Sequence, residues 1–289
     1  MDPQGSPARV GRDGALSLCF ERRGPATVLA GCRFTLPLQV LAPLALDGAG
    51  AVVSMLNPTG SVLGGDHLRI DVRVEAGAHA LLTTPSATRV HRTDGPAAVQ
   101  EVSLRVAPGA VMEWVPDHTI PYAGSAYRQS IRAHVGPGAS LILLDAFAAG
   151  RVARGERWRF RVLESGLTIT DDDGWLLHDR FVLTGAGGWE GLGFSEGAPY
   201  LATMAVVTPA PEDAVTSAAR EALAAAVDVR GGVGRLPRRG ILIRCLAETA
   251  PALGDGVRAV WGHPPVSTPT TRVDGSAPRR TRNSASSFV

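Results

Sequence analysis

Histidine and cysteine are the residues best suited to hold a transition metal, and their spacing decides whether a preformed site exists. No two histidines form a His-x-His, His-x-x-x-His or His-Glu-x-x-His group; the seven are His67, His79, His91, His118, His134, His178 and His263. The cysteines form no Cys-x-x-Cys pair, and their odd, sparse count is typical of a reducing compartment; they are Cys19, Cys32 and Cys245. The sequence therefore predicts no tight zinc or nickel cage.

Carboxylates are the other candidates for chemistry. Asp171-Asp172-Asp173-Gly174 lacks the ligand spacing of a calcium loop, so an acidic hairpin tip is the better interpretation. The chain has no Gly-x-Ser-x-Gly elbow and no Gly-Lys-Ser/Thr phosphate loop. A pair such as Asp66 and Asp145 could supply the acid and base of a β-helix carbohydrate-active enzyme, although aromatic residues are only 5% of the chain and leave few platforms for sugar stacking. That enzyme is the alternative hypothesis.

Composition limits the classes of protein that remain. The 289 residues include 34 glycines and 21 prolines, which argues against a helical bundle, while 45% hydrophobic residues indicate a globular core. The net charge is +2, and the arginines follow no single basic stripe, so nucleic acid is not an expected partner. The N-terminus lacks a signal-peptide pattern, and the least charged stretch, residues 48–65, is broken by glycines. We expect a cytoplasmic protein that does not insert into a membrane.

A repeated unit organises the middle of the chain. Three copies of one pattern are Val74-Glu-Ala-Gly-Ala78, Val106-Ala-Pro-Gly-Ala110 and Val135-Gly-Pro-Gly-Ala139. Each copy follows a run in which apolar and polar residues alternate, as in a half-buried strand, and precedes a more continuously apolar run, as in a strand covered on both faces. Proline followed by glycine suits a type II turn. Strands repeated at a period of about 30 residues predict a mainly β fold, a β-helix-like stack of strands and hairpins.

The pattern changes towards the C-terminus. Strands continue to about residue 207, with hairpin signals at Ser165-Gly166 and Asp172-Asp173-Gly174. About two α-helices follow in the C-terminal third; the elements expected are a helix over 211–229, a strand over 240–246 and a weaker helix over 253–261. We therefore predict one β-rich domain over 15–261, flanked by disordered segments at 1–14 and at 262–289, the latter rich in Pro, Ser, Thr and Arg.

Four blocks of sequence occur in an order that matches a known family. They are NPTGSVLGGD (57–66), AGAHALLTTPSATRVHR (76–92), GAVMEWVPD (109–117) and ARGERWRF (153–160). With these blocks the chain resembles the urease accessory protein family UreD, also called UreH, from about residue 15 to 261. The sequence departs from the family pattern at His91, where Tyr is expected, at Arg89, where Lys is common, and after Trp261.

The resemblance implies a non-enzymatic scaffold that assists nickel delivery into apo-urease in a complex with UreF and the GTPase UreG. No tightly bound cofactor is expected, only transient Ni²⁺. A conduit should not hold its ion tightly, and Ni²⁺ binds imidazole and thiolate ligands strongly, so spaced oxygen ligands suit it better. Within the matched blocks and near them, the expected nickel-path residues are Asp66, Thr88, Asp145 and Asp179. For Glu156, an internal ion pair with Arg154 or Arg157 is as reasonable as contact with nickel.

Overall fold

The computed structural model describes residues 12–46, 49–185 and 187–262. Most of the two segments expected to be disordered, residues 1–11 and 263–289, lies outside the described residues. The first strand begins at Asp13, inside the segment expected to precede the domain.

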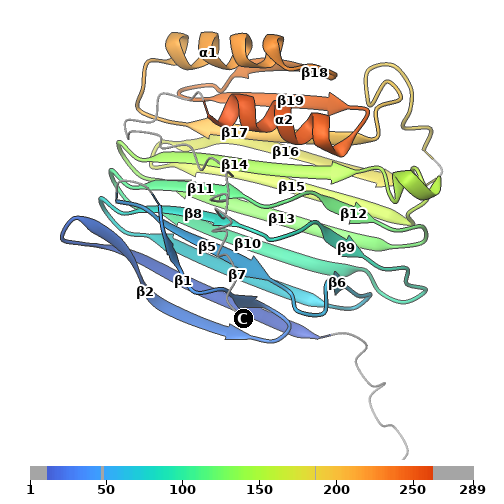
Figure 1. Ribbon diagram of the computed structural model, residues 1–289, viewed down its shortest axis with the longest axis horizontal. Helices are drawn as coiled ribbons and strands as arrows, with labels where there is room; N and C mark the ends of the chain where they lie inside the picture. The colour runs from blue at the N-terminus through green and yellow to red at the C-terminus, as the bar shows by residue number, and fades with distance from the viewer. Residues whose placement is uncertain (1–11, 47–48, 186, 263–289) are drawn as a thin grey trace, which may run out of the picture.

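Two facing sheets make up the body of the molecule (Figure 1). The seven-stranded sheet runs in the order β16 (Gly174–Thr184), β15 (Val162–Asp171), β13 (Ala126–Val135), β10 (Ala98–Val106), β7 (His67–Val74), β1 (Asp13–Arg23) and β2 (Ala26–Thr35). The main path of the twelve-stranded sheet is β18 (Val229–Arg235), β19 (Ile241–Ala247), β17 (Tyr200–Val207), β14 (Ser140–Ala148), β11 (Val111–Val115), β8 (His79–Thr83), β5 (Ala51–Leu56) and β3 (Gln39–Val40). Four short strands attach to it: β4 (Leu44–Ala45), β6 (Ser61–Val62), β9 (Thr88–Val90) and β12 (Thr119–Pro121).

The repeated unit is one coil of a β-solenoid. In each copy the chain leaves a strand of one sheet, makes the glycine turn and enters a strand of the other, as from β7 to β8, β10 to β11 and β13 to β14. Strands of successive copies lie parallel within each sheet, and about four coils are formed. The mainly β, β-helix-like fold predicted from the repeat is therefore confirmed.

The turns have the backbone geometry that their residues predict. Gly77, Gly109 and Gly138 have φ of 70°, 65° and 65°, a region that glycine enters without strain. In the second copy the Ala110 N–H donates to the Ala107 carbonyl at 3.0 Å, which closes a four-residue turn around Pro108-Gly109. The common glycine is therefore required by the reversal of the chain between the two sheets.

The core lies between the two sheets, and β14 is buried on both faces. Leu141, Leu143 and Phe147 on its inner face belong to the solenoid core. Ile142 and Leu144 on its outer face pack in a second cluster with the C-terminal helices. This explains the unbroken apolar run in the third repeat. On the outer faces of β8 and β11, Leu81 and Val115 are buried and the other residues are half-buried.

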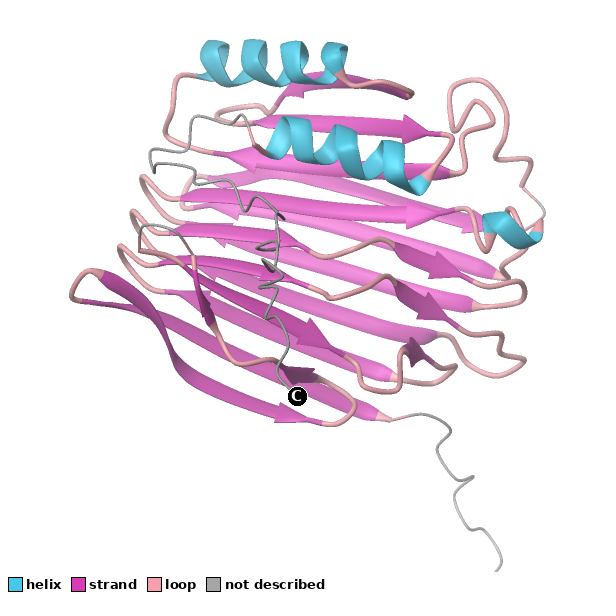
Figure 2. Cartoon of the chain, viewed as in Figure 1, coloured by secondary structure: helices cyan, strands magenta, loops and turns pink. Residues whose placement is uncertain are grey.

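Two α-helices, α1 (Glu212–Ala225) and α2 (Ala250–Trp261), pack on the outer face of the twelve-stranded sheet near β17, β18 and β19 (Figure 2). Both helices were expected, although α1 ends at Ala225 and not at residue 229, where β18 begins; the strand expected over 240–246 corresponds to β19. One short 3-10 turn, η1, covers Val152–Arg154. No helix in the described part of the chain has the length and apolar character needed to cross a membrane.

One hairpin prediction was wrong. Ser165 and Gly166 lie in the middle of β15, which pairs with β16 through both residues. The chain reverses at the other predicted hairpin, Asp172-Asp173-Gly174, which is confirmed. Apolar residues alternate with polar ones on both sides of Ser165-Gly166, so a continuous strand keeps one face buried. A turn there would remove part of that face from the core.

Helix α2 depends on a side-chain cap. Thr249 Oγ1 accepts a hydrogen bond from the Ala252 N–H at 3.2 Å. We expect Thr249→Ala to lower the free energy of unfolding by about 1 kcal/mol, because an N-terminal amide of the helix loses its partner. Urea unfolding measures this, with Thr249→Ser as the control that retains the hydroxyl; equal stability of Thr249→Ala and the unmodified protein would show that the cap is unimportant.

Candidate functional site

Asp145 is a carboxylate on the inner face of a strand whose other residues are almost all apolar. Its side chain is buried, and it accepts hydrogen bonds from two groups of the opposite sheet: Gln129 Nε2 donates to Oδ1 at 2.9 Å and Ser165 Oγ donates to Oδ2 at 2.8 Å. Gln129 and Ser165 are register partners on β13 and β15. Asp145 thus joins the two sheets across the core by polar contacts.

The polar contacts continue along the inside of the seven-stranded sheet. Gln100 is the register partner of Gln129 on β10, and Gln100 Nε2 donates to Gln129 Oε1 at 3.1 Å. The Tyr127 hydroxyl donates to the same oxygen at 3.2 Å. The side chains of Gln100, Gln129 and Ser165 therefore form a row that crosses three neighbouring strands and ends at Asp145.

Burial raises the pKa of Asp145 to about 6. The hydrogen bonds from Ser165 and Gln129 act in the opposite direction, and the negative charge of Asp179 adds to the increase. Burial also raises the pKa of Tyr127, with a further contribution from Asp145. At neutral pH Asp145 is thus an ionised carboxylate in a desolvated position, an arrangement that favours a nearby cation.

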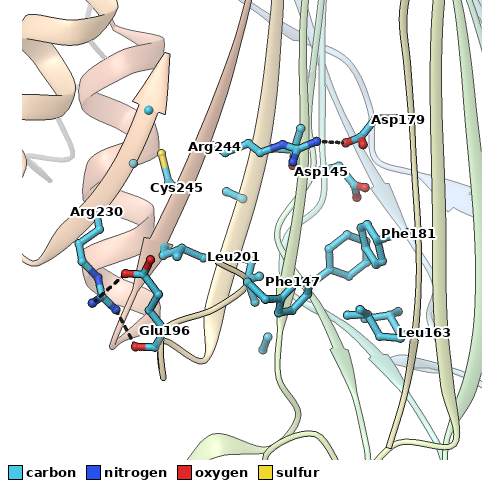
Figure 3. A pocket seen from close by; sticks show the side chains of 18 of the residues that line it. Asp145, Phe147, Leu163, Asp179, Phe181, Glu196, Leu201, Arg230, Arg244 and Cys245 are labelled. Atoms are coloured by element: carbon cyan, nitrogen blue, oxygen red, sulfur yellow. Dashed lines mark hydrogen bonds and ion pairs between the residues drawn. The ribbon is translucent and has the colours of Figure 1, made fainter. Parts of the chain in front are cut away.

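A cavity of about 570 Å³ lies on one side of Asp145, bordered by strands β14 to β19 (Figure 3). Its wall includes Asp145 and Asp179, and the apolar part of the wall includes Phe147, Leu163, Phe181 and Leu201. Asp179 Oδ2 contacts Arg244 Nη2 at 2.7 Å, and the Arg230 and Glu196 side chains, also in the wall, pair at 3.6 Å. The cavity therefore brings together two of the predicted path residues.

A second, smaller cavity of about 70 Å³ borders Asp145 as well. Thr88, another predicted path residue, contributes to its wall, as do Gln100, Gln129 and Trp114. Among the described residues, Asp145 is the one that belongs to the walls of both cavities. Asp145 consequently stands at the boundary between the two spaces.

Each cavity wall also contains a buried indole without an acceptor inside the described protein. Trp114 belongs to the smaller cavity and Trp158 to the larger, and neither Nε1 has a hydrogen-bond partner. A buried donor of this kind is normally satisfied. Each cavity therefore has, in one of its wall residues, a buried hydrogen-bond donor that no described group of the protein satisfies.

Asp66, by contrast, lies in the wall of neither cavity. Its carboxylate accepts hydrogen bonds from the backbone N–H groups of Arg12 and Leu63, both at 2.9 Å, and it is buried. These contacts hold the turn that precedes β7. The structure therefore does not place Asp66 and Asp145 in one cavity as the carboxylate pair that the carbohydrate-active alternative requires.

Glu156 forms an ion pair, but the partner is Arg151 and not Arg154 or Arg157. Arg151 Nε donates to Glu156 Oε2 at 2.7 Å, and Arg157 donates to the Gly197 carbonyl at 3.4 Å. The 3-10 turn η1 is followed by Gly155, whose φ is 69°, and this reversal brings Glu156 back to Arg151. The partner of Glu156 is thus corrected from Arg154 or Arg157 to Arg151.

The described residues contain no group of three or more His, Cys, Asp or Glu side chains that could hold a metal ion. The cavity walls around Asp145 instead hold separate oxygen-bearing side chains, with apolar residues and the arginines Arg180, Arg230 and Arg244 also in the wall of the larger cavity. Sequence reasoning missed Gln129, Ser165 and Arg244. Gln129 and Ser165 could have been found, because each is a polar residue at a position where the alternation along its strand predicts a buried apolar one.

Comparison with known proteins gives a consistent result. A model of the family described as UreD urease accessory protein matches residues 12–282, which extends beyond residue 261 where the resemblance was expected to end. The UreD protein of Alkalilimnicola ehrlichii is 34% identical over 264 residues, 90% of this chain and 88% of that protein. The UreD protein of Haloarcula marismortui is 31% identical over 265 residues, 90% and 89% of the two chains. The solenoid and these matches together establish that this chain belongs to the UreD family of urease accessory proteins.

Proposed function

We propose that this protein assists urease maturation in the cytoplasm by guiding Ni²⁺ through the space between its two sheets towards apo-urease, docked together with UreF and UreG. UreD proteins are accessory factors of urease maturation and are not themselves catalysts. The observation that carries the proposal is the position of Asp145, a desolvated carboxylate between two cavities.

The nickel path that we propose passes Thr88 in the smaller cavity, Asp145 at the boundary and Asp179 in the larger cavity. These side chains offer one hydroxyl and two carboxylates, with no imidazole in either wall. Oxygen ligands in small number bind Ni²⁺ more weakly than a His or Cys cage and therefore release it more readily. Asp66, whose carboxylate holds two backbone amides, supports the turn before β7 in this scheme.

A scaffold needs surfaces for its partners, and the segment 34–44 offers an apolar one. Phe34, Leu36, Leu41 and Leu44 are 48%, 58%, 51% and 69% exposed. Several large exposed apolar side chains so close together in sequence are typical of a contact surface for another protein. This favours a role in a complex over a role as an isolated protein.

The test is co-expression of the urease operon with and without this chain. We expect omission of the chain to leave purified urease with little nickel per active site, while urease with normal subunit content is still made. A parallel affinity purification should recover UreF with this protein. The proposal is overturned if urease acquires its normal nickel content without the chain, or if the chain neither recruits UreF nor raises the nickel content of urease.

A further inference from the structure

The two sheets end at different places on the side of the larger cavity. The seven-stranded sheet ends at β16, whereas the twelve-stranded sheet continues past β17 to β19 and β18. Asp145, Thr203 and Arg244 are register partners on β14, β17 and β19, so their side chains lie on one face of that sheet. Arg244 thus lies in the same row of side chains as Asp145, at the end of the row that the seven-stranded sheet does not cover.

Arg244 reaches from this row to the opposite sheet. Its Nη2 contacts Asp179 Oδ2 on β16 at 2.7 Å, and both residues belong to the wall of the larger cavity (Figure 3). The Arg244 side chain is 59% exposed and that of Asp179 is 25% exposed. An ion pair with this much access to water contributes little to stability and opens readily.

Asp179 and Asp145 are both carboxylates in the wall of the larger cavity, so their negative charges repel one another. A positive charge beside Asp179 therefore reduces the repulsion between the two carboxylates. The guanidinium group of Arg244 supplies that charge. A divalent cation at the same place would supply it more strongly.

We propose that Arg244 is a tethered counter-ion that occupies the cation position beside Asp179 when no metal ion is present and that Ni²⁺ displaces. The inference rests on the proposed function for the identity of the cation, and it assigns Arg244 as a positioning residue of the nickel path. Competition from an attached cation weakens metal binding at Asp179. The ion then passes this carboxylate without being retained.

The test is isothermal titration calorimetry, in which the purified full-length chain is titrated with Ni²⁺ alone. We expect Arg244→Gln to tighten Ni²⁺ binding by about fivefold, the change that loss of one exposed ion pair can produce. The gain should vanish in the double variant Arg244→Gln with Asp179→Asn, because the carboxylate that Arg244 shields is then neutral.

A matched control is Arg128→Gln. Arg128 is 60% exposed, pairs with Glu164 at 3.3 Å, and lies in the wall of neither cavity. We expect it to leave Ni²⁺ binding unchanged. Unchanged or weaker binding in Arg244→Gln, equal tightening in Arg128→Gln, or tightening that survives Asp179→Asn would each overturn the role of Arg244. The titration contains no urease, so its outcome is separate from that of the co-expression experiment.

Discussion

Urease matured with an Asp145→Asn variant of this protein is expected to contain on the order of tenfold less nickel per active site than urease matured with the unmodified protein. Asparagine has nearly the same shape as aspartate, and its amide oxygen can still accept from Ser165 or Gln129. The substitution therefore removes the charge at the boundary between the cavities while preserving most of the packing. The measurement is nickel per urease active site after co-expression, by elemental analysis of the purified enzyme.

Asp66→Asn is the matched control for this prediction. It makes the same chemical change at another buried aspartate of the solenoid, one that holds two backbone amides and lies in neither cavity wall. We expect it to reduce the stability of this protein. At equal amounts of folded accessory protein, we expect it to leave nickel per urease active site unchanged. Equal nickel loss in the two variants would mean that the effect comes from folding and not from the path.

The stability of the protein should depend on the ionisation of Asp145. Burial raises the pKa of its carboxyl from the ordinary value of 3.8 to about 6 in the folded protein. The folded state therefore binds this proton more tightly than the unfolded state does, and the contribution of the group to stability is greatest below pH 4. That contribution is lost as the pH rises to about 6 and above, by about 3 kcal/mol in total.

Urea unfolding at a series of pH values between 4 and 7.5, compared between the unmodified protein and Asp145→Asn, isolates this contribution. Other carboxyls, such as those of Glu101 and Asp117, have lowered pKa values and act in the opposite direction in both proteins. We expect the stability of the variant relative to the unmodified protein to increase as the pH rises through this window. A difference that stays constant with pH would show that Asp145 does not titrate as its burial implies.

The solenoid could be predicted from the sequence because local signals agree with the global arrangement. The glycine at the same place in each repeat, Gly77, Gly109 or Gly138, adopts the positive φ that the turn requires. The alternation before each turn sets one buried face, and period two fixes which residues point inward. The run at 141–144 also predicted cover on both faces, which the helices provide.

The polar row inside the core was predictable in part. Each polar residue of the row lies two positions before an inward-facing apolar residue of its strand, so it should face the same side. These residues are Gln100, Gln129 and Ser165. Their phase predicts that they face inward, but their alignment across the strands depends on register, which only the assembled sheet fixes. The sequence thus indicates Asp145 as a candidate, and the fold supplies its hydrogen-bond partners.

The pairings of Asp179 and Glu156 could not have been predicted from sequence spacing. Asp179 meets Arg244, which is 65 positions away, because one sheet extends beyond the other. Glu156 pairs with Arg151 because a 3-10 turn reverses the chain between them, while Arg157, its neighbour in sequence, donates to the Gly197 carbonyl. Ion pairs of this kind follow from tertiary geometry, which the order of charges along the chain does not determine.

The most direct test of the interior nickel path is X-ray diffraction at the nickel absorption edge from crystals of the full-length protein soaked in Ni²⁺. We expect an anomalous peak between the two sheets, next to the carboxylate of Asp145 or Asp179, and no peak at Asp145 in the Asp145→Asn variant. Anomalous peaks confined to histidines and carboxylates on the outer surface, with none between the sheets at saturating Ni²⁺, would rule out the interior path.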